Sequence, residues 1–314
     1  MNPPHPIPFE LRSRETLKAG IRRLGDALAQ QVQASIASGP ENQESAVHEA
    51  RLAIKRLRAA VRLLTGTLGE KAARRHQARL RNAARRLASA RDVAVGVVTM
   101  DGLAKELPDA LRSPFQAWRQ RLAGPGHVPR ESPARIAAHL KAAAGAIRTV
   151  SVAIDRTTWR RHGWETLEDG LMDTYRRARR RFRAAHTTDD EESFHRWRTA
   201  VKAFMYQLCL VRPIAPKRLG GCIKDLNRLQ KSLGDEHDLA VLSERLANTK
   251  EAGKGVPKLD SKPIRRLIAS RQQRWRKKAL KEGRRLFADR PKQFIRRIHK
   301  EWKAWHRPTK STPP

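Results

Sequence analysis

The chain has 314 residues and a formal net charge of +36, from 67 Lys and Arg residues against 31 Asp and Glu residues. So large a positive excess favours a polyanionic partner, such as nucleic acid, an anionic membrane or polymeric phosphate, but it does not indicate a fold. Two cysteines are too few to crosslink a chain of this length, and the longest apolar run, over residues 93–100, falls short of the ~20 residues that span a membrane.

Helical periodicity dominates the chain, and no alternating pattern of useful length indicates a strand. The sequence therefore predicts an all-α protein. The expected helices cover residues 11–38, 43–65, 70–107, 133–154, 164–186, 191–211, 216–249, 262–289 and 291–305. About four amphipathic helices fall in each half, and a four-helix bundle is an economical way to bury their apolar faces.

Two segments of the second half repeat segments of the first. Residues 194–211 align without a gap with residues 47–64, and residues 229–242 align with residues 84–97 at nearly the same offset. The aligned polar pairs are His48 with His195, Arg51 with Arg198, Lys55 with Lys202, and Asp92 with Asp238. These matches indicate an internal duplication, with its seam near residues 155–163.

The helix expected over residues 43–65 has a basic edge beside its apolar face. At about 100° per residue, its apolar side chains gather on one face and five cationic side chains gather on the adjoining face. Cations that flank a core can pack their stems and direct their heads into a groove between helices. We therefore expect an anion-binding row, which consists of His48, Arg51, Lys55, Arg58 and Arg62.

The expected anion-binding set extends this row to the next helix and to the repeat. In the first half it contains His48, Arg51, Lys55, Arg58, Arg62, Arg81, Arg85 and Arg91. In the second half it contains His195, Arg198, Lys202, Lys224, Arg228, Lys231 and His237. Structural roles are expected for Asp92, Asp238 and Tyr206. The two carboxylates would orient neighbouring cations, and the tyrosine would form part of the core or of the groove wall. The alternatives are that the histidines only pack, and that arginines outside the repeat, such as the run over residues 176–183, are simply solvated.

Sequence signals for catalysis are absent. The chain has no Gly-rich P-loop, no HExxH, no Cys-x-x-Cys pair and no alternating-glutamate ExExK motif. Aromatic residues make up only 5% of the chain, so a stacking surface for single-stranded nucleic acid is weakly supported. We therefore expect a binding protein that is not an enzyme and that needs no metal or cofactor.

Four short segments carry a resemblance to a known family. The segments VHEARLAIKRLRA (47–59) and FHRWRTAVKAFMY (194–206), with ARDVAV (90–95) and LGDEHDLAVL (233–242), resemble the CHAD family, the conserved histidine α-helical domain. The resemblance covers residues 9–289 and implies two four-helix bundles, 9–157 and 158–289, related by pseudo-two-fold symmetry. Residues 290–314 would form a basic C-terminal helix and tail. The second repeat departs from the first where Ala203 and Met205 replace the cations of Arg56 and Arg58, so its basic edge is weaker than that of the first.

The resemblance implies a non-enzymatic module that binds inorganic polyphosphate in a basic groove or pore. We expect a cytoplasmic protein associated with polyphosphate granules, without a membrane partner. The alternative is a nucleic-acid-binding protein that uses the same basic surface, because nonspecific affinity for DNA or RNA accompanies so high a charge. A phosphohydrolase acting on polyphosphate is a third class, disfavoured because no carboxylate cluster for a divalent metal is visible in the sequence.

Overall fold

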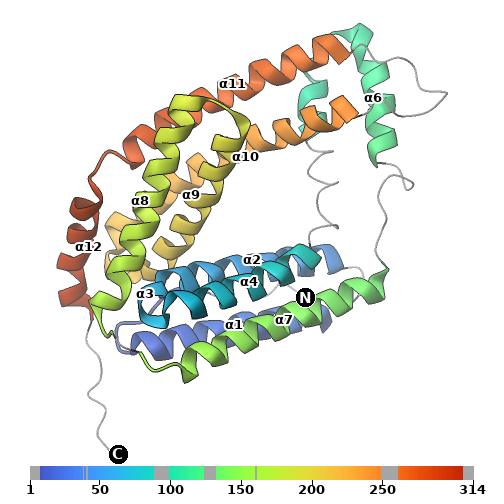
Figure 1. Ribbon diagram of the computed structural model, residues 1–314. Coiled ribbons are helices and arrows are strands. Elements are labelled where there is room, and N and C mark those ends of the chain that lie inside the picture. The colour runs from blue at the N-terminus through green and yellow to red at the C-terminus, as the bar shows by residue number, and fades with distance from the viewer. Residues whose placement is uncertain are drawn as a thin grey trace, which may run out of the picture.

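The computed structural model describes residues 8–37, 39, 42–87, 99–123, 132–159, 161–248 and 261–306, and every regular element in these segments is a helix (Figure 1). The helices are α1 (Leu17–Ala37), α2 (Gln43–Leu63), α3 (Thr65–Leu68), α4 (Glu70–Arg86), α6 (Asp109–Ala123), α7 (Pro133–Arg156), α8 (Trp164–Thr188), α9 (Glu191–Val211), the 3-10 turn η2 (Arg212–Ile214), α10 (Pro216–Asn248), α11 (Ser261–Leu286) and α12 (Pro291–Trp305). The predicted all-α class is confirmed. Within the described segments, no helix combines the length and the apolarity that a membrane crossing requires.

Two of the predicted helices differ from those observed. The N-terminal helix begins at Leu17 rather than at residue 11, because Phe9 and Leu11 are buried in the core and the Leu11 amide donates to the Leu210 carbonyl (2.9 Å). The helix predicted over residues 70–107 is not continuous, because α4 ends at Arg86, although residues 99–104 are helical as predicted. Helix α6, which follows Pro108, was not predicted. Pro114 lies inside α6, where a proline ordinarily argues against a helix because it has no N–H to donate.

The first group of helices consists of α1, α2, α4 and α7 (Figure 1). Helix α7 lies along α1, and α2 contacts α1, α4 and α7. The start of α7 is fixed by Ser132, whose hydroxyl accepts a hydrogen bond from the Arg135 amide (3.3 Å), and by Pro133 in the first turn. The apolar positions that predicted α2, among them Ile54 and Leu57, are its buried face.

The second group consists of α8, α9, α10 and α11, and α12 packs on α8. The buried ring of Tyr175 on α8 stacks on Phe294 of α12 (centroids 4.6 Å apart) and meets Phe204 of α9 edge-on (5.4 Å). The Tyr175 hydroxyl donates to the Asp289 carbonyl (3.1 Å), which fixes the turn before α12. The helices therefore contact one another in two groups, while the internal duplication itself stays a prediction.

Close backbone packing joins the two groups. Gly170 of α8 lies against the backbone of Leu63 in α2, so that a Cβ at this position would come within 2.0 Å of the Leu63 carbonyl oxygen. Nearby, Gln207 of α9 donates its side-chain amide to the Ala59 carbonyl of α2 (3.2 Å). Helix α2 is therefore the element of the first group on which α8 and α9 rest.

A segment of the first half also packs on the second group. The α10–α11 hairpin extends beyond α8 and α9, and residues 99–123 lie against its tip (Figure 1). Met100, Leu103 and Phe115 form a small apolar cluster there with side chains of both hairpin helices, such as Leu242 and Ile268. The chain between α4 and α7 thus contributes to the far end of the second group.

Candidate polyanion-binding surface

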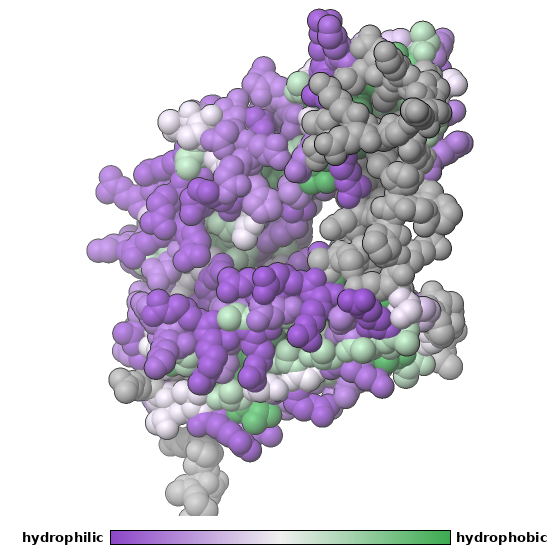
Figure 2. All heavy atoms as spheres, turned by 45° about the vertical axis from the view of Figure 1, so that its right-hand side comes forward, coloured by the Kyte–Doolittle hydropathy of each residue, from purple (hydrophilic) through white to green (hydrophobic). Residues whose placement is uncertain are grey.

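The two predicted rows of cations lie on α2 and α9, which meet through their C-terminal halves. The contact between Gln207 and the Ala59 carbonyl marks this meeting point. His48 and His195 stand near the starts of the two helices, about 16–18 Å along their axes from the contact at a rise of about 1.5 Å per residue. Figure 2 shows hydrophilic side chains on both sides of a hollow between the two groups of helices.

Guanidinium groups from both groups of helices gather where α2 meets α8. Arg58 and Arg62 on α2 are half-buried. The pKa of Arg62 is lowered to about 10, chiefly by burial and then by the charges of Arg177 on α8 and of Arg58. Burial, and then the charge of Arg81 on α4, also lower the pKa of Arg58. We call Arg58, Arg62, Arg81 and Arg177 the junction cluster.

No carboxylate balances this cluster within the part of the chain that the structure describes. Arg58 is positioned by a neutral partner, since its Nε donates to Gln77 Oε1 (3.1 Å) and Gln77 Nε2 donates back to the Arg58 carbonyl (2.6 Å). Several arginines elsewhere do have counter-charges, as in the pair of Arg276 with the buried Glu236 (2.9 Å). Because gathered like charges oppose folding, the junction cluster is suited to an anion that comes from solution.

A second basic cluster is centred on two histidines. His195 on α9 and His237 on α10 lie with their ring centroids 5.0 Å apart. Burial lowers the pKa of His237 to about 4, and the charges of Arg198, His195 and Lys202 act in the same direction. We call His195, Arg198, Lys202 and His237 the histidine cluster. Its four members were all predicted from the sequence, and the structure brings them together.

The remaining members of the α2 row continue it away from the junction. His48 is exposed, and Arg51 and Lys55 are half-buried. Arg51 Nη1 donates to the Leu87 carbonyl at the end of α4 (2.9 Å), so its guanidinium is held in place by the backbone. The row therefore runs along α2 from the start of the helix to the junction cluster.

Several predicted residues lie elsewhere. Arg85 is exposed on α4 and bonds to Asn82 (2.6 Å). Lys224, Arg228 and Lys231 are exposed on a face of α10 that does not carry His237, and Arg228 pairs with Asp225. Tyr206 is half-buried against the core, and Asp238 is half-buried beside His237. The predicted residues Arg91 and Asp92 lie outside the described segments.

One member of the junction cluster was missed from the sequence. Arg177 belongs to the arginine-rich run over residues 176–183, which reads as a solvated face. Only the crossing of α8 over α2 brings Arg177 near Arg62. The sequence does contain one local signal for that crossing. Gly170 is a glycine inside a helical pattern, and here it allows the backbone of α2 to approach closely.

The fold and the surface define an all-helical protein with cations clustered where its two groups of helices meet. A sequence model of the CHAD domain matches residues 19–247, and the chain belongs to the CHAD domain family. This family is known to be associated with polyphosphate. The family resemblance drawn from the histidine-containing repeats is confirmed.

The fold is also similar to a solved structure, the crystal structure of the CHAD domain from the plant Ricinus communis. The TM-score is 0.50, with 18% sequence identity, and the similarity covers 96% of this chain and 96% of that chain. At this level of identity the similarity establishes the fold alone. Among curated proteins, none matches the chain in sequence.

Proposed function

We propose that the protein binds long-chain inorganic polyphosphate, without catalysis, through the junction cluster and the histidine cluster. The observation that carries this proposal is the pair of half-buried guanidiniums at the junction, Arg58 and Arg62, which have the exposed Arg81 and Arg177 as like-charged neighbours and no carboxylate partner in the described segments. Guanidinium groups bind phosphate oxygens two at a time, and a linear phosphate polymer supplies one negative charge after another along α2 and α9.

The aromatic residues favour polyphosphate over single-stranded nucleic acid. Trp159, Trp164, Trp197 and Trp302 are buried, with at most 7% of each exposed. A binder of single strands stacks bases on exposed aromatic rings, and a polyphosphate chain has no base to stack. Nonspecific binding of duplex DNA or RNA through the same surface is the second candidate function, because the net charge of +36 alone supports it.

Calorimetry with the purified full chain tests the proposal. We expect long-chain polyphosphate to bind more tightly than short chains at equal total phosphate concentration, because only a long chain reaches both clusters. Equal affinity for the two would refute it. Duplex DNA and RNA are then added as competitors at about 150 mM salt, and displacement of polyphosphate by either would favour the nucleic-acid function instead.

Charge reversal separates a defined site from diffuse attraction. The double variant Lys55→Glu with Lys202→Glu removes one cation from the α2 row and one from the histidine cluster. The control Arg180→Glu with Arg183→Glu makes the same change in net charge at two exposed positions of α8. We expect at least tenfold weaker binding in the first variant than in the control, and equal losses would indicate that only net charge matters.

Association with polyphosphate granules in the cytoplasm is part of the same proposal. Fluorescence microscopy of the tagged chain should show foci in cells that contain polyphosphate and a diffuse signal in cells that lack it. The charge-reversal variant should be diffuse in both. Foci that persist in cells without polyphosphate would show that localisation does not depend on polyphosphate binding, and would contradict this part of the proposal.

A further inference from the structure

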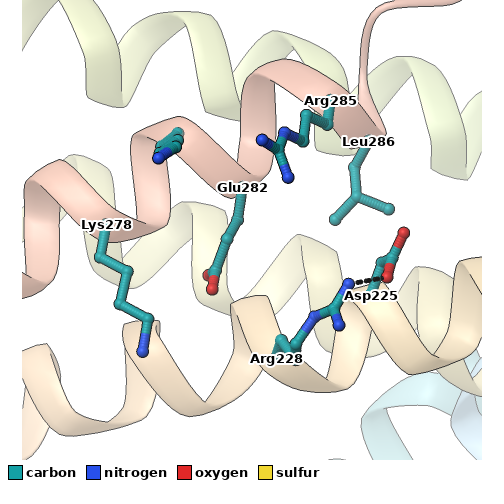
Figure 3. Close-up of a pocket in the computed structure, with 7 residues that line it drawn as sticks. Asp225, Arg228, Lys278, Glu282, Arg285 and Leu286 are labelled. Atoms are coloured by element: carbon teal, nitrogen blue, oxygen red, sulfur yellow. Dashed lines mark hydrogen bonds and ion pairs between the residues drawn. The ribbon is translucent and has the colours of Figure 1, made fainter.

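A charged pocket lies on the side of α10 opposite the histidine cluster. It has a volume of about 350 Å³ and opens between α10 and α11 (Figure 3). Its lining residues are Asp225, Arg228, Lys278, Lys281, Glu282, Arg285 and Leu286. Arg228 and His237 are nine residues apart on α10, which places them about 180° apart at about 100° per residue. The pocket is therefore separate from the histidine cluster.

The pocket differs from the junction cluster because it contains carboxylates that are held in place. Glu282 points from α11 toward α10 (Figure 3), and its Oε2 accepts a hydrogen bond from the hydroxyl of the fully buried Ser232 (2.9 Å). Asp225 pairs with Arg228 across one turn of α10. Each carboxylate has lone pairs beyond the single bond that fixes it, so both can accept further hydrogen bonds from a ligand.

The cations outnumber these carboxylates. Arg228, Lys278, Lys281 and Arg285 give the pocket a formal net charge of +2 against Asp225 and Glu282. Lys281 and Arg285 are exposed, and neither forms an ion pair within the described segments. The pocket thus offers a place for about two negative charges beside hydrogen-bond acceptors.

This combination selects a particular ligand chemistry. A phosphate monoester carries a charge between about −1.5 and −2 at neutral pH, which matches the excess of cations. Hydroxyl groups of the same ligand can donate to Glu282 and Asp225. The internal phosphates of a polyphosphate chain have no proton to donate, so the two carboxylates would repel them. Among the described residues that line the pocket, Leu286 is the one apolar side chain, and none carries an aromatic ring on which a base could stack.

We propose that the α10–α11 pocket binds a small phosphate monoester that also carries hydroxyl groups, such as a sugar phosphate, at a site separate from the polyphosphate surface. Arg228, Lys281 and Arg285 bind the phosphate, and Glu282 accepts hydrogen bonds from the hydroxyls. The volume of about 350 Å³ lies at the lower end of the range of small-molecule sites, about 300–1,000 Å³.

Titration calorimetry of the full chain with glucose 6-phosphate tests this site, with inorganic phosphate and glucose as comparison probes, at about 150 mM salt. We expect glucose 6-phosphate to bind at least fivefold more tightly than inorganic phosphate, and glucose not to bind. Lys281→Gln should weaken binding of glucose 6-phosphate at least threefold. The control Lys277→Gln, an exposed lysine of the same helix outside the pocket, should leave it unchanged.

A second variant tests the role of the carboxylate. Glu282→Gln keeps an acceptor for Ser232 but removes the negative charge, so we expect it to bind inorganic phosphate more tightly and to lose the preference for glucose 6-phosphate. Equal affinity of the wild type for the two probes would overturn the proposal. So would loss of glucose 6-phosphate binding in the Lys55→Glu with Lys202→Glu variant but not in Lys281→Gln. Polyphosphate binding should be unaffected by Lys281→Gln, so the two proposals can fail independently.

Discussion

The imidazole rings of His195 on α9 and His237 on α10 lie 5.0 Å apart, centroid to centroid, and share their surroundings with Arg198 and Lys202. The pKa of His237 is about 4, lowered chiefly by burial and then by these three positive neighbours. His237 is therefore neutral at pH 7 in the free protein. An anion bound at this cluster would favour the protonated form, so we expect the pair to couple proton binding to the proposed polyanion binding.

The stability of the free protein is predicted to fall as the pH is lowered from 6.5 toward 4. The unfolded chain protonates His237 near its ordinary pKa of 6.5, whereas the folded protein does so at about 4, so the unfolded state binds more protons in this window. The contribution is on the order of 1 kcal/mol, because solvent screens the partly exposed ring. Urea unfolding at pH 7.5 and 5.0 should show a smaller difference in His237→Gln than in the wild type. An unchanged difference would contradict the low pKa.

Polyphosphate binding is predicted to take up protons and to tighten as the pH falls from 7.5 to 5.5. The negative charge of the ligand raises the pKa of His237 toward its ordinary value, which is the reverse of the effect of its cationic neighbours. Calorimetry in two buffers with different ionisation enthalpies counts the protons. His237→Gln should reduce the count, while His162→Gln, an exposed histidine before α8, should not. Equal counts in all three proteins would place His237 away from the bound chain.

Arg177 is predicted to oppose folding and to favour ligand binding. Its charge lies near Arg62 across the junction of the two groups of helices, so Arg177→Gln relieves a repulsion of up to about 0.5 kcal/mol in the free protein. The same change removes one cation of the proposed site and should weaken polyphosphate binding about three- to tenfold, or about 1 kcal/mol. Thermal unfolding and calorimetry measure the two effects, with Arg180→Gln on the exposed face of α8 as control. Loss of both stability and affinity would instead indicate a structural role.

Local sequence signals account for the parts of the fold that were predicted well. The bounds of α9 match the prediction because its start is set by Asp190, whose carboxylate accepts a hydrogen bond from the Ser193 amide (2.7 Å). Its end is set by the 3-10 turn η2, which contains Pro213. The late start of α1 and the existence of α6 depend on distant partners instead. Leu11 bonds to the end of α9, and Phe115 packs on the α10–α11 hairpin, contacts that no local pattern encodes.

The same distinction applies to the candidate site. Helical periodicity placed Arg58 and Arg62 on one edge of α2, and the repeat placed Arg198 on the matching edge of α9. Periodicity does not say which helix faces a given edge. Arg228 on α10 was therefore grouped with His237, although it lines the pocket shared with α11. Arg177 was overlooked because its neighbour Arg62 lies in the other half of the chain.

The Gly170→Ala substitution is predicted to destabilise the contact between α8 and α2. A Cβ there would lie 2.0 Å from the carbonyl oxygen and 2.6 Å from the carbonyl carbon of Leu63, and backbone atoms inside a helix cannot move aside as a flexible side chain can. Gly170→Ala should therefore lower the free energy of unfolding by about 1–3 kcal/mol. The matched control is Gly145→Ala on the exposed face of α7, where a Cβ meets nothing within 4 Å and should raise stability by about 0.5–1 kcal/mol.

Urea denaturation measures both changes as shifts in the midpoint at constant slope. The Gly170→Ala variant carries a second readout, because α8 holds Arg177 near Arg62 only while the two backbones are in contact. Polyphosphate affinity of the folded variant should fall, while that of Gly145→Ala should match the wild type. A Gly170→Ala midpoint at or above that of the wild type would mean that α8 does not approach α2 this closely. The junction cluster would then lack the contact that brings its cations together.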